Sequence, residues 1–162
     1  MTISIHKGDL LSSSDVDAIV NTVNCVGVMG KGIALQFKKK WPDNFKEYQK
    51  ACKNHQVVIG KMFIHHLGAL ATPKYIVNFP TKQHWRSPSK ISDIKAGLAD
   101  LIETVNNCGI ESIAIPPLGC GNGGLNWDDV YPLIVETFAN YPDVDVRIYP
   151  PSNQPDATTI SE

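Results

Sequence analysis

Lys82 is the residue whose type and position most directly suggest chemistry. It follows Pro80 and Thr81 at the end of an apolar, β-branched run, Tyr75–Phe79, that is typical of a buried strand. A lysine held at the mouth of a crevice, partly desolvated and near other positive charge, has a lowered pKa and can act as a nucleophile or a base. A solvated surface lysine is the alternative interpretation of this position.

Two glycine-rich loops could bind a phosphate group. Gly27-Val-Met-Gly30-Lys31-Gly32 follows a predicted strand and begins a predicted helix, where free backbone amides and the helix dipole favour an anion. Gly119-Cys120-Gly121-Asn122-Gly123-Gly124 follows another predicted strand. Tight turns that need positive φ would explain either loop alone. Because strand ends in α/β sheets form one ligand crevice, the pair together predicts a diphosphate held between them.

Neither loop fits the better-known nucleotide-binding motifs. Lys31 is followed by Gly32 rather than by Ser or Thr, so the first loop is not a Walker A sequence. The second loop formally matches Gly-x-Gly-x-x-Gly, but that fingerprint belongs to the first βαβ unit of a dinucleotide-binding sheet. Because at most one strand follows the loop here, we do not predict a Rossmann fold.

Asp9 and Asn24 also lie at the ends of predicted strands. Asp9 could accept a hydrogen bond from an exocyclic amine such as that of adenine, although an Asp in this position is also common as a turn or helix cap. Asn24 offers a donor and an acceptor to a sugar hydroxyl, or its amide could pin a loop. The sequence leaves both alternatives open.

His84, Trp85 and Arg86 follow Lys82 closely. They combine a hydrogen-bonding ring, a stacking face and a planar cation, which suits unstacked bases and phosphates. Trp85 could instead be a core residue. The separate basic run Lys38–Lys40 is interpreted as the solvated face of a helix.

Thiol and metal chemistry are not predicted. Cys25 and Cys120 adjoin candidate site residues, and a thiol nucleophile there is an alternative, but no acidic or histidine partner lies nearby in sequence. His65 and His66 are adjacent on a predicted strand and therefore point to opposite faces. We expect no metal and no cofactor. No Cys-x-x-Cys pair occurs among the four cysteines, Cys25, Cys52, Cys108 and Cys120.

Strands and helices alternate along the chain, which predicts a three-layer α/β/α domain with a central mixed β-sheet. Helical spacing over Ile91–Val105 is framed by Ser89 as a cap and Gly109 as a stop. The predicted strands are Ile3–His6, Asp17–Val23, Lys61–His66, Tyr75–Phe79, Ser112–Pro116 and Val144–Tyr149. The other predicted helices are Ile33–Phe37, Pro42–Asn54 and Val130–Phe138.

The composition is that of one soluble domain. The chain has 162 residues, 43% of them hydrophobic, with no membrane-spanning run and no secretory signal, so we expect a cytoplasmic protein. A formal net charge of −1 excludes nucleic-acid binding by bulk positive charge. We assign residues 1–150 to the domain and residues 151–162 to a disordered tail or the beginning of a linker.

Over about residues 1–149 the chain resembles the macrodomain family, the ADP-ribose-binding fold. The motifs Lys-Gly-Asp9-Leu10, Asn21-Thr-Val-Asn24-Cys, Gly27-Val-Met-Gly-Lys-Gly-Ile-Ala and Pro-Pro-Leu-Gly-Cys-Gly-Asn-Gly-Gly-Leu have the order and spacing of that family. The segment Asn78-Phe-Pro-Thr-Lys82-Gln-His-Trp-Arg86 is similar to that of DarG-type macrodomains, which remove ADP-ribose from DNA.

The resemblance implies a role for each matching residue. Asp9 and Leu10 would meet the adenine, Asn24 the distal ribose, and Lys82 would be catalytic together with Asn24. Related glycohydrolases pair the lysine with an aspartate of the second loop, but Asn122 and its neighbours offer no acid. The residues that would surround the diphosphate and distal ribose are Gly30, Lys31, Gly32, Ile33, Gly119, Cys120, Gly121, Asn122, Gly123, Gly124 and Leu125.

The implied function is hydrolysis of the bond between ADP-ribose and thymine bases of single-stranded DNA, with ADP-ribose as product. His84, Trp85 and Arg86 would contact the DNA. The resemblance also implies an antitoxin that pairs with a DarT-like toxin through a region this chain does not contain. Two alternatives stay open: an ADP-ribose-binding module without hydrolase activity, and a hydrolase acting on protein-linked ADP-ribose or on ADP-ribose 1″-phosphate.

Overall fold

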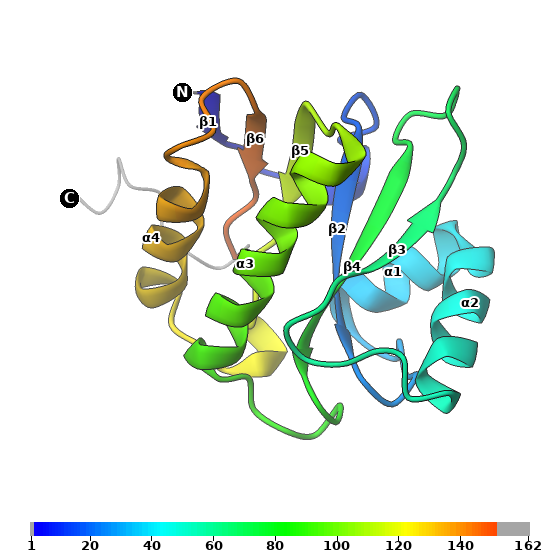
Figure 1. Cartoon of the computed structure of the whole chain (residues 1–162). Coiled ribbons are helices and arrows are strands. Elements are labelled where there is room, and N and C mark those ends of the chain that lie inside the picture. Colours follow the sequence, from blue (N-terminus) through cyan, green and yellow to red (C-terminus); the bar gives the residue numbers. More distant parts are fainter. Residues whose placement is uncertain (1, 152–162) are drawn as a thin grey trace.

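The computed structural model describes residues 2–151 as one mixed sheet covered by helices on both faces (Figure 1). The strands are β1 (Thr2–Ile5), β2 (Ala18–Asn24), β3 (Phe63–His66), β4 (Tyr75–Lys82), β5 (Ser112–Ile115) and β6 (Asp145–Ile148). The helices are α1 (Gly32–Lys40), α2 (Pro42–Lys53), α3 (Ile91–Cys108) and α4 (Trp127–Phe138), with short 3₁₀ turns η1 (Leu10–Ser12) and η2 (Gly121–Gly123).

The sheet has the strand order β1-β6-β5-β2-β4-β3. All neighbouring strands are parallel except β3, which runs antiparallel to β4 at one edge. Helices α3 and α4 cover one face, and α1 and α2 cover the other (Figure 1). The predicted three-layer α/β/α arrangement with a mixed sheet is therefore confirmed.

The central strands are apolar on both faces because helices cover both. Along β2, Ala18 and Val20 pack in the core under α3 and α4, whereas Ile19 packs on the opposite side with Phe37 of α1. Helix α3 approaches β4 so closely that the ring of Phe79 occupies the place of a side chain at Gly97. These contacts fix the carboxyl ends of β2, β4 and β5 relative to one another.

Helix ends agree with the sequence prediction at one end of α3 and differ at the other. Gly109 adopts the left-handed conformation that ends the helix. Ser89 is not the cap, which corrects our prediction. Lys90 holds the cap position without a side-chain bond, and the backbone N–H of the buried Ser89 donates to Gly123 O at 2.9 Å.

Helix α4 begins before the predicted Val130, since Asn126 caps it by accepting from Asp128 N.

The predicted tail or linker, residues 151–162, lies outside the described residues 2–151 except for Pro151. Within residues 2–151, none of the helices combines the length and apolar character needed to cross a bilayer.

Candidate functional site

A cavity of about 550 Å³ opens at the carboxyl ends of the central strands. Its walls come from the ends of β2 and β4, the start of α1, and the loop between β5 and α4. Most predicted site residues meet there. Those that line it are Asn24, Gly30, Lys31, Gly32, Ile33, Lys82, Trp85, Gly119, Cys120, Gly121, Asn122 and Gly123.

The sheet register places Asn24 and Lys82 side by side. They are paired residues on the parallel strands β2 and β4, just past an irregularity between Val23 and Asn24. The chain continues this pairing beyond the strands, since Cys25 N donates to Gln83 O at 3.0 Å. The two residues predicted to act together are therefore held on rigid neighbouring strands.

Lys82 is anchored across the cavity rather than extended into solvent. Its Nζ donates to Trp85 O at 3.1 Å and to Asn122 O, in the second glycine loop, at 3.5 Å. Partial burial, and next the positive charge of Lys31, lower the pKa of this amine. A larger fraction of Lys82 is therefore the free amine than for a solvated lysine.

The side chain of Asn24 has a fixed orientation. Its Oδ1 accepts from Val26 N at 3.1 Å, from Val28 N at 3.3 Å and from the Tyr48 hydroxyl at 2.8 Å. One Nδ2 hydrogen is donated to Val28 O at 2.9 Å. An amide nitrogen carries a second hydrogen, so the group that Asn24 can offer a ligand is a donor. Pinning the loop and meeting a ligand are thus compatible roles.

Tyr48 supports Asn24 from α2, outside the cavity. The single hydroxyl hydrogen of the buried phenol is shared between the backbone oxygen and the Oδ1 of Asn24, which each lie 2.8 Å from the phenol oxygen. Burial raises the pKa of Tyr48, so the hydroxyl stays protonated and remains a donor. No sequence motif indicated this residue, because its partner lies in a different element 24 positions away.

The two glycine loops converge on one point. A side chain added to Gly32 would begin 3.4 Å from Asn122 Nδ2. Gly32 begins α1, and Gly121 begins η2, so both loops present helix N-termini whose first amides lack helical partners. With Lys31 beside them, these amides form a positive environment suited to a diphosphate.

Glycine is required in the second loop by close packing. Gly119 has φ +72°, and a side chain there would lie 2.6 Å from Leu125 Cδ1. At Gly123 the hydroxyl of Ser89 occupies the place of a side chain. Ser89 therefore packs directly against the loop at Gly123.

Six predicted site residues lie outside the cavity lining. Asp9 caps η1 by accepting from Leu11 N at 3.0 Å and lies in a separate open depression with Lys39 and Lys40. The other five are Leu10, which is buried, together with Gly124, Leu125, His84 and Arg86. The role of Asp9 and Leu10 at an adenine remains a prediction.

The segment after β4 forms a compact stacked group. The Arg86 guanidinium lies 4.4 Å from the centre of the Trp85 ring, and the His84 ring lies 5.1 Å from it. Arg86 N donates to His84 Nδ1 at 3.1 Å. Trp85 is 41% exposed and lines the cavity, so it is a surface residue rather than a core one.

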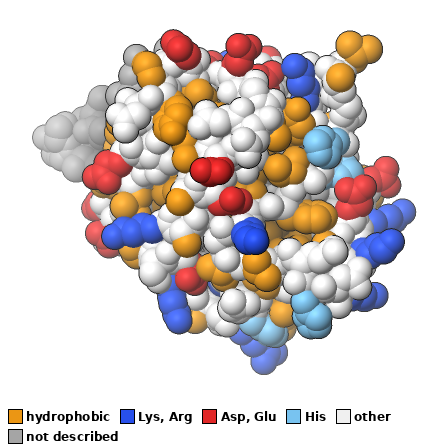
Figure 2. All heavy atoms as spheres, viewed as in Figure 1, with side chains coloured by type: hydrophobic (Ala, Val, Ile, Leu, Met, Phe, Trp, Pro, Cys, Tyr) orange, Lys and Arg blue, Asp and Glu red, His pale blue; other side chains and the backbone are white. Residues whose placement is uncertain are grey.

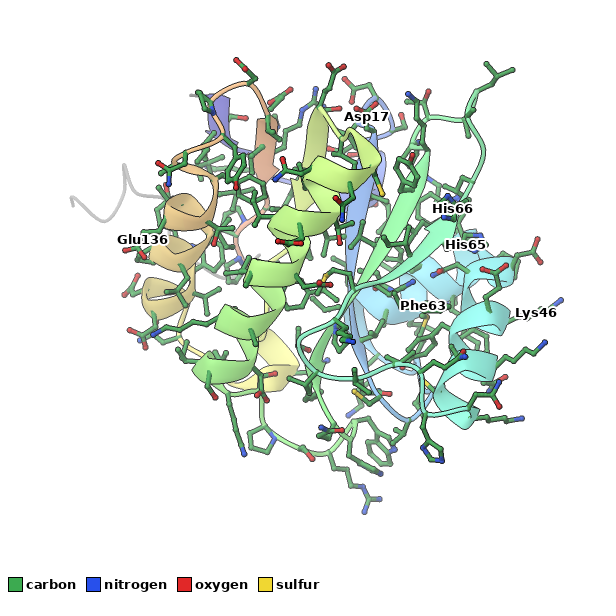
Figure 3. The ribbon with its side chains drawn as sticks, viewed as in Figure 1. Asp17, Lys46, Phe63, His65, His66 and Glu136 are labelled. Atoms are coloured by element: carbon green, nitrogen blue, oxygen red, sulfur yellow. The ribbon has the colours of Figure 1, made fainter. Side chains whose placement is uncertain are left out.

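The cysteines do not have the properties of nucleophiles. Burial raises the pKa of Cys25 and of Cys120 to about 11, which leaves little thiolate near neutral pH. Among residues 2–151 no three His, Cys, Asp or Glu side chains come together as a metal site. On β3, His65 is buried and bonded to Glu47 Oε1 at 2.6 Å, whereas His66 is exposed (Figure 3).

Comparisons with known proteins agree with this geometry. The family model described as "Macro domain" matches residues 20–134. A Mycobacterium tuberculosis protein named "DNA ADP-ribosyl glycohydrolase" is 59% identical over 150 residues, covering 93% of this chain and 42% of that protein. The chain thus spans less than half the length of this curated relative.

Two solved structures are similar over nearly the whole chain. The "Macrodomain of Mycobacterium tuberculosis DarG" has 58% identity and a TM-score of 0.90, covering 93% of this chain and 99% of that one. "Thermosipho africanus DarTG in complex with ADP-ribose" has 34% identity and a TM-score of 0.87, covering 98% of this chain and 44% of that one. With its fold, its paired glycine loops and these matches, the chain belongs to the macrodomain family.

Proposed function

We propose that this chain is an ADP-ribosyl glycohydrolase that removes ADP-ribose from thymine bases of single-stranded DNA. The observation that carries the proposal is the pairing of Lys82 with Asn24 in a cavity that the two glycine-rich loops also line. The mycobacterial relative named "DNA ADP-ribosyl glycohydrolase", which is 59% identical, supports it.

The chemistry needed is cleavage of a glycosidic bond at the distal ribose. Such cleavage passes through an oxocarbenium-like state at the anomeric carbon C1″ and benefits from a nearby nucleophile or base. The glycine loops would hold the diphosphate, and the Nδ2 of Asn24 would donate to the distal ribose. The Lys82 amine would then either attack C1″, giving its proton to the departing thymine before water hydrolyses the adduct, or take a proton from the water that attacks C1″ and pass it to the thymine. In both routes the C1″–N bond to thymine breaks and ADP-ribose is released.

The segment beside Lys82 favours a nucleic acid as the carrier of ADP-ribose. His84, Trp85 and Arg86 are exposed and in contact with one another, and Trp85 lines the cavity. Aromatic faces and guanidinium groups bind single-stranded bases and phosphates. The contact is local, as a chain with net charge −1 requires.

We also propose that the chain serves in an antitoxin that reverses the action of a DarT-like toxin. The support is the similarity to the Thermosipho africanus DarTG structure. Any toxin contact outside the macrodomain would need parts of the longer relatives that this chain does not cover.

The test compares two substrates. The protein is incubated with a single-stranded oligonucleotide carrying ADP-ribosyl thymine and, separately, with a protein carrying ADP-ribose on carboxylates, and released ADP-ribose is measured. We expect rapid release from the oligonucleotide only. Release from the protein alone would assign a different hydrolase, and tight ADP-ribose binding without release would assign a binding module.

The pH dependence of turnover is expected to report Lys82. The free amine is the active form, so kcat/KM rises with pH through the pKa of Lys82. Because burial and Lys31 lower that pKa, the half-rise lies below the value of about 10.4 for an ordinary lysine. Lys31→Gln removes the neighbouring charge and moves the half-rise to higher pH.

The pH profile is measured as kcat/KM on the oligonucleotide, with Lys95→Gln on α3 as the charge-matched control. The control should keep the wild-type half-rise. An unchanged or lowered half-rise in Lys31→Gln would contradict the assignment of this titration to Lys82.

A further inference from the structure

Two exposed apolar side chains, Val28 and Trp85, line the cavity, and a third, Val26, lies two residues before Val28. Six large hydrophobic residues are exposed among residues 2–151, and three of them are Val26 (46%), Val28 (38%) and Trp85 (41%). Val28 and Trp85 line the cavity, and Val26 adjoins it in sequence. The face shown in Figure 2 illustrates the usual pattern, in which hydrophobic groups are interspersed with polar and charged ones. We call Val26, Val28 and Trp85 the apolar rim. Exposed apolar side chains beside a cavity are typical of ligand-binding sites.

The two valines are held outward by their own loop. Gly27 between them has φ +86° and packs against Gln49 and Cys52 of α2. The Asn24 amide binds Val26 N, Val28 N and Val28 O. The rim is therefore preorganised and needs no rearrangement to receive a ligand.

The apolar rim lies next to Lys82, the residue proposed to act on the substrate. The loop of the valines and the segment of Trp85 leave neighbouring strands and are joined by the bond from Cys25 N to Gln83 O. Lys82 Nζ donates to Trp85 O. If C1″ lies beside Lys82, a group attached to it would lie near Trp85 and the loop of Val28, which both line the cavity.

We propose that Val26 and Val28, together with Trp85, form a base-recognition subsite that contacts the methyl group of the thymine leaving group. This inference rests on the proposed function and adds the determinant of base choice. A valine side chain offers no hydrogen bond, so a phosphate or a carboxylate gains nothing from it. The C5 methyl is the apolar group that distinguishes thymine, and small apolar side chains contact it in protein–DNA complexes.

The size of the effect follows from apolar burial. One methyl group removed from water corresponds to about a 4-fold change, and up to about 10-fold where the pocket is well formed. We therefore expect wild-type protein to prefer an ADP-ribosyl thymine oligonucleotide over the matched uracil oligonucleotide by about 5-fold in kcat/KM.

The experiment combines two changes in a thermodynamic cycle: removal of the C5 methyl group from the substrate and substitution of Val28 in the protein. The kcat/KM of wild type, Val28→Ala and Val28→Thr is measured on both oligonucleotides, which differ only in the C5 methyl. Both variants are expected to reduce the thymine-to-uracil ratio to about 1 to 2. Val58→Ala, an equally exposed valine away from the cavity, is the matched control and should retain the ratio of about 5.

The outcomes separate the two proposals. If wild-type protein releases ADP-ribose from neither oligonucleotide, the proposed function fails. If it hydrolyses both and the ratio is 1, or if the ratio survives Val28→Ala and Val28→Thr, the subsite is wrong while the function stands. Because Val28 is a surface residue, its substitution is expected to leave the fold intact.

Discussion

Replacing Lys82 with alanine is expected to lower kcat on ADP-ribosyl thymine DNA by about 10³-fold, within the range of groups that transfer protons or attack in the rate-limiting step. The amine lies where β4 ends, bonded to Trp85 O and Asn122 O, and its pKa is lowered by burial and by Lys31. Within residues 2–151 the other lysine that lines the cavity is Lys31, which is itself exposed.

Binding must be separated from turnover in this variant. In the proposed function the glycine loops would hold the diphosphate through backbone amides, so Lys82→Ala should bind ADP-ribose within a few-fold of wild type by calorimetry. Lys90→Ala, an exposed lysine at the start of α3, is the control for general loss of positive charge and should remain active. Turnover by Lys82→Ala close to the wild-type rate would remove Lys82 from the mechanism.

Asn24→Asp is expected to lower kcat/KM by about 10²-fold although the two side chains have nearly the same shape. The carboxylate can still accept from Val26 N, Val28 N and the Tyr48 hydroxyl. It has no hydrogen for Val28 O or for a ribose, and its negative charge next to Lys82 raises the pKa of the amine.

Two measurements distinguish this explanation from simple unfolding. The pH profile of Asn24→Asp should have its half-rise at higher pH than wild type, and its melting temperature should fall only modestly. Asn140→Asp, the same change at an exposed position after α4, should match wild type in both. Full activity in Asn24→Asp would show that the N–H donor is not needed.

Local sequence patterns were sufficient for the layers and for most of the cavity. Runs such as Ala18–Val20 in β2 and Ile76–Val77 in β4 are apolar at consecutive positions because both sheet faces are covered, and this pattern is visible without a structure. Glycine loops after two such strands predicted a shared crevice, since parallel strands present their carboxyl ends at one edge. The meeting of Gly32 with Asn122 confirms that the two loops face each other.

Contacts between elements that are distant in sequence could not be predicted from these local patterns. Tyr48 bonds to Asn24 from a helix that does not line the cavity. Ser89 does not cap α3 as predicted, because it packs against Gly123 instead. Asp9 is a different case, because the same carboxylate could cap a helix or contact an adenine. In the structure it caps η1. Such choices depend on tertiary packing rather than on neighbouring residues.

A crystal structure of the protein with ADP-ribose tests the central claim most directly. The claim predicts the diphosphate against the amides at the starts of α1 and η2, Asn24 Nδ2 bonded to the distal ribose, and Lys82 Nζ about 3 to 3.5 Å from C1″. Nucleotide bound outside this cavity, or a distal ribose beyond the reach of the Lys82 amine, would contradict the account.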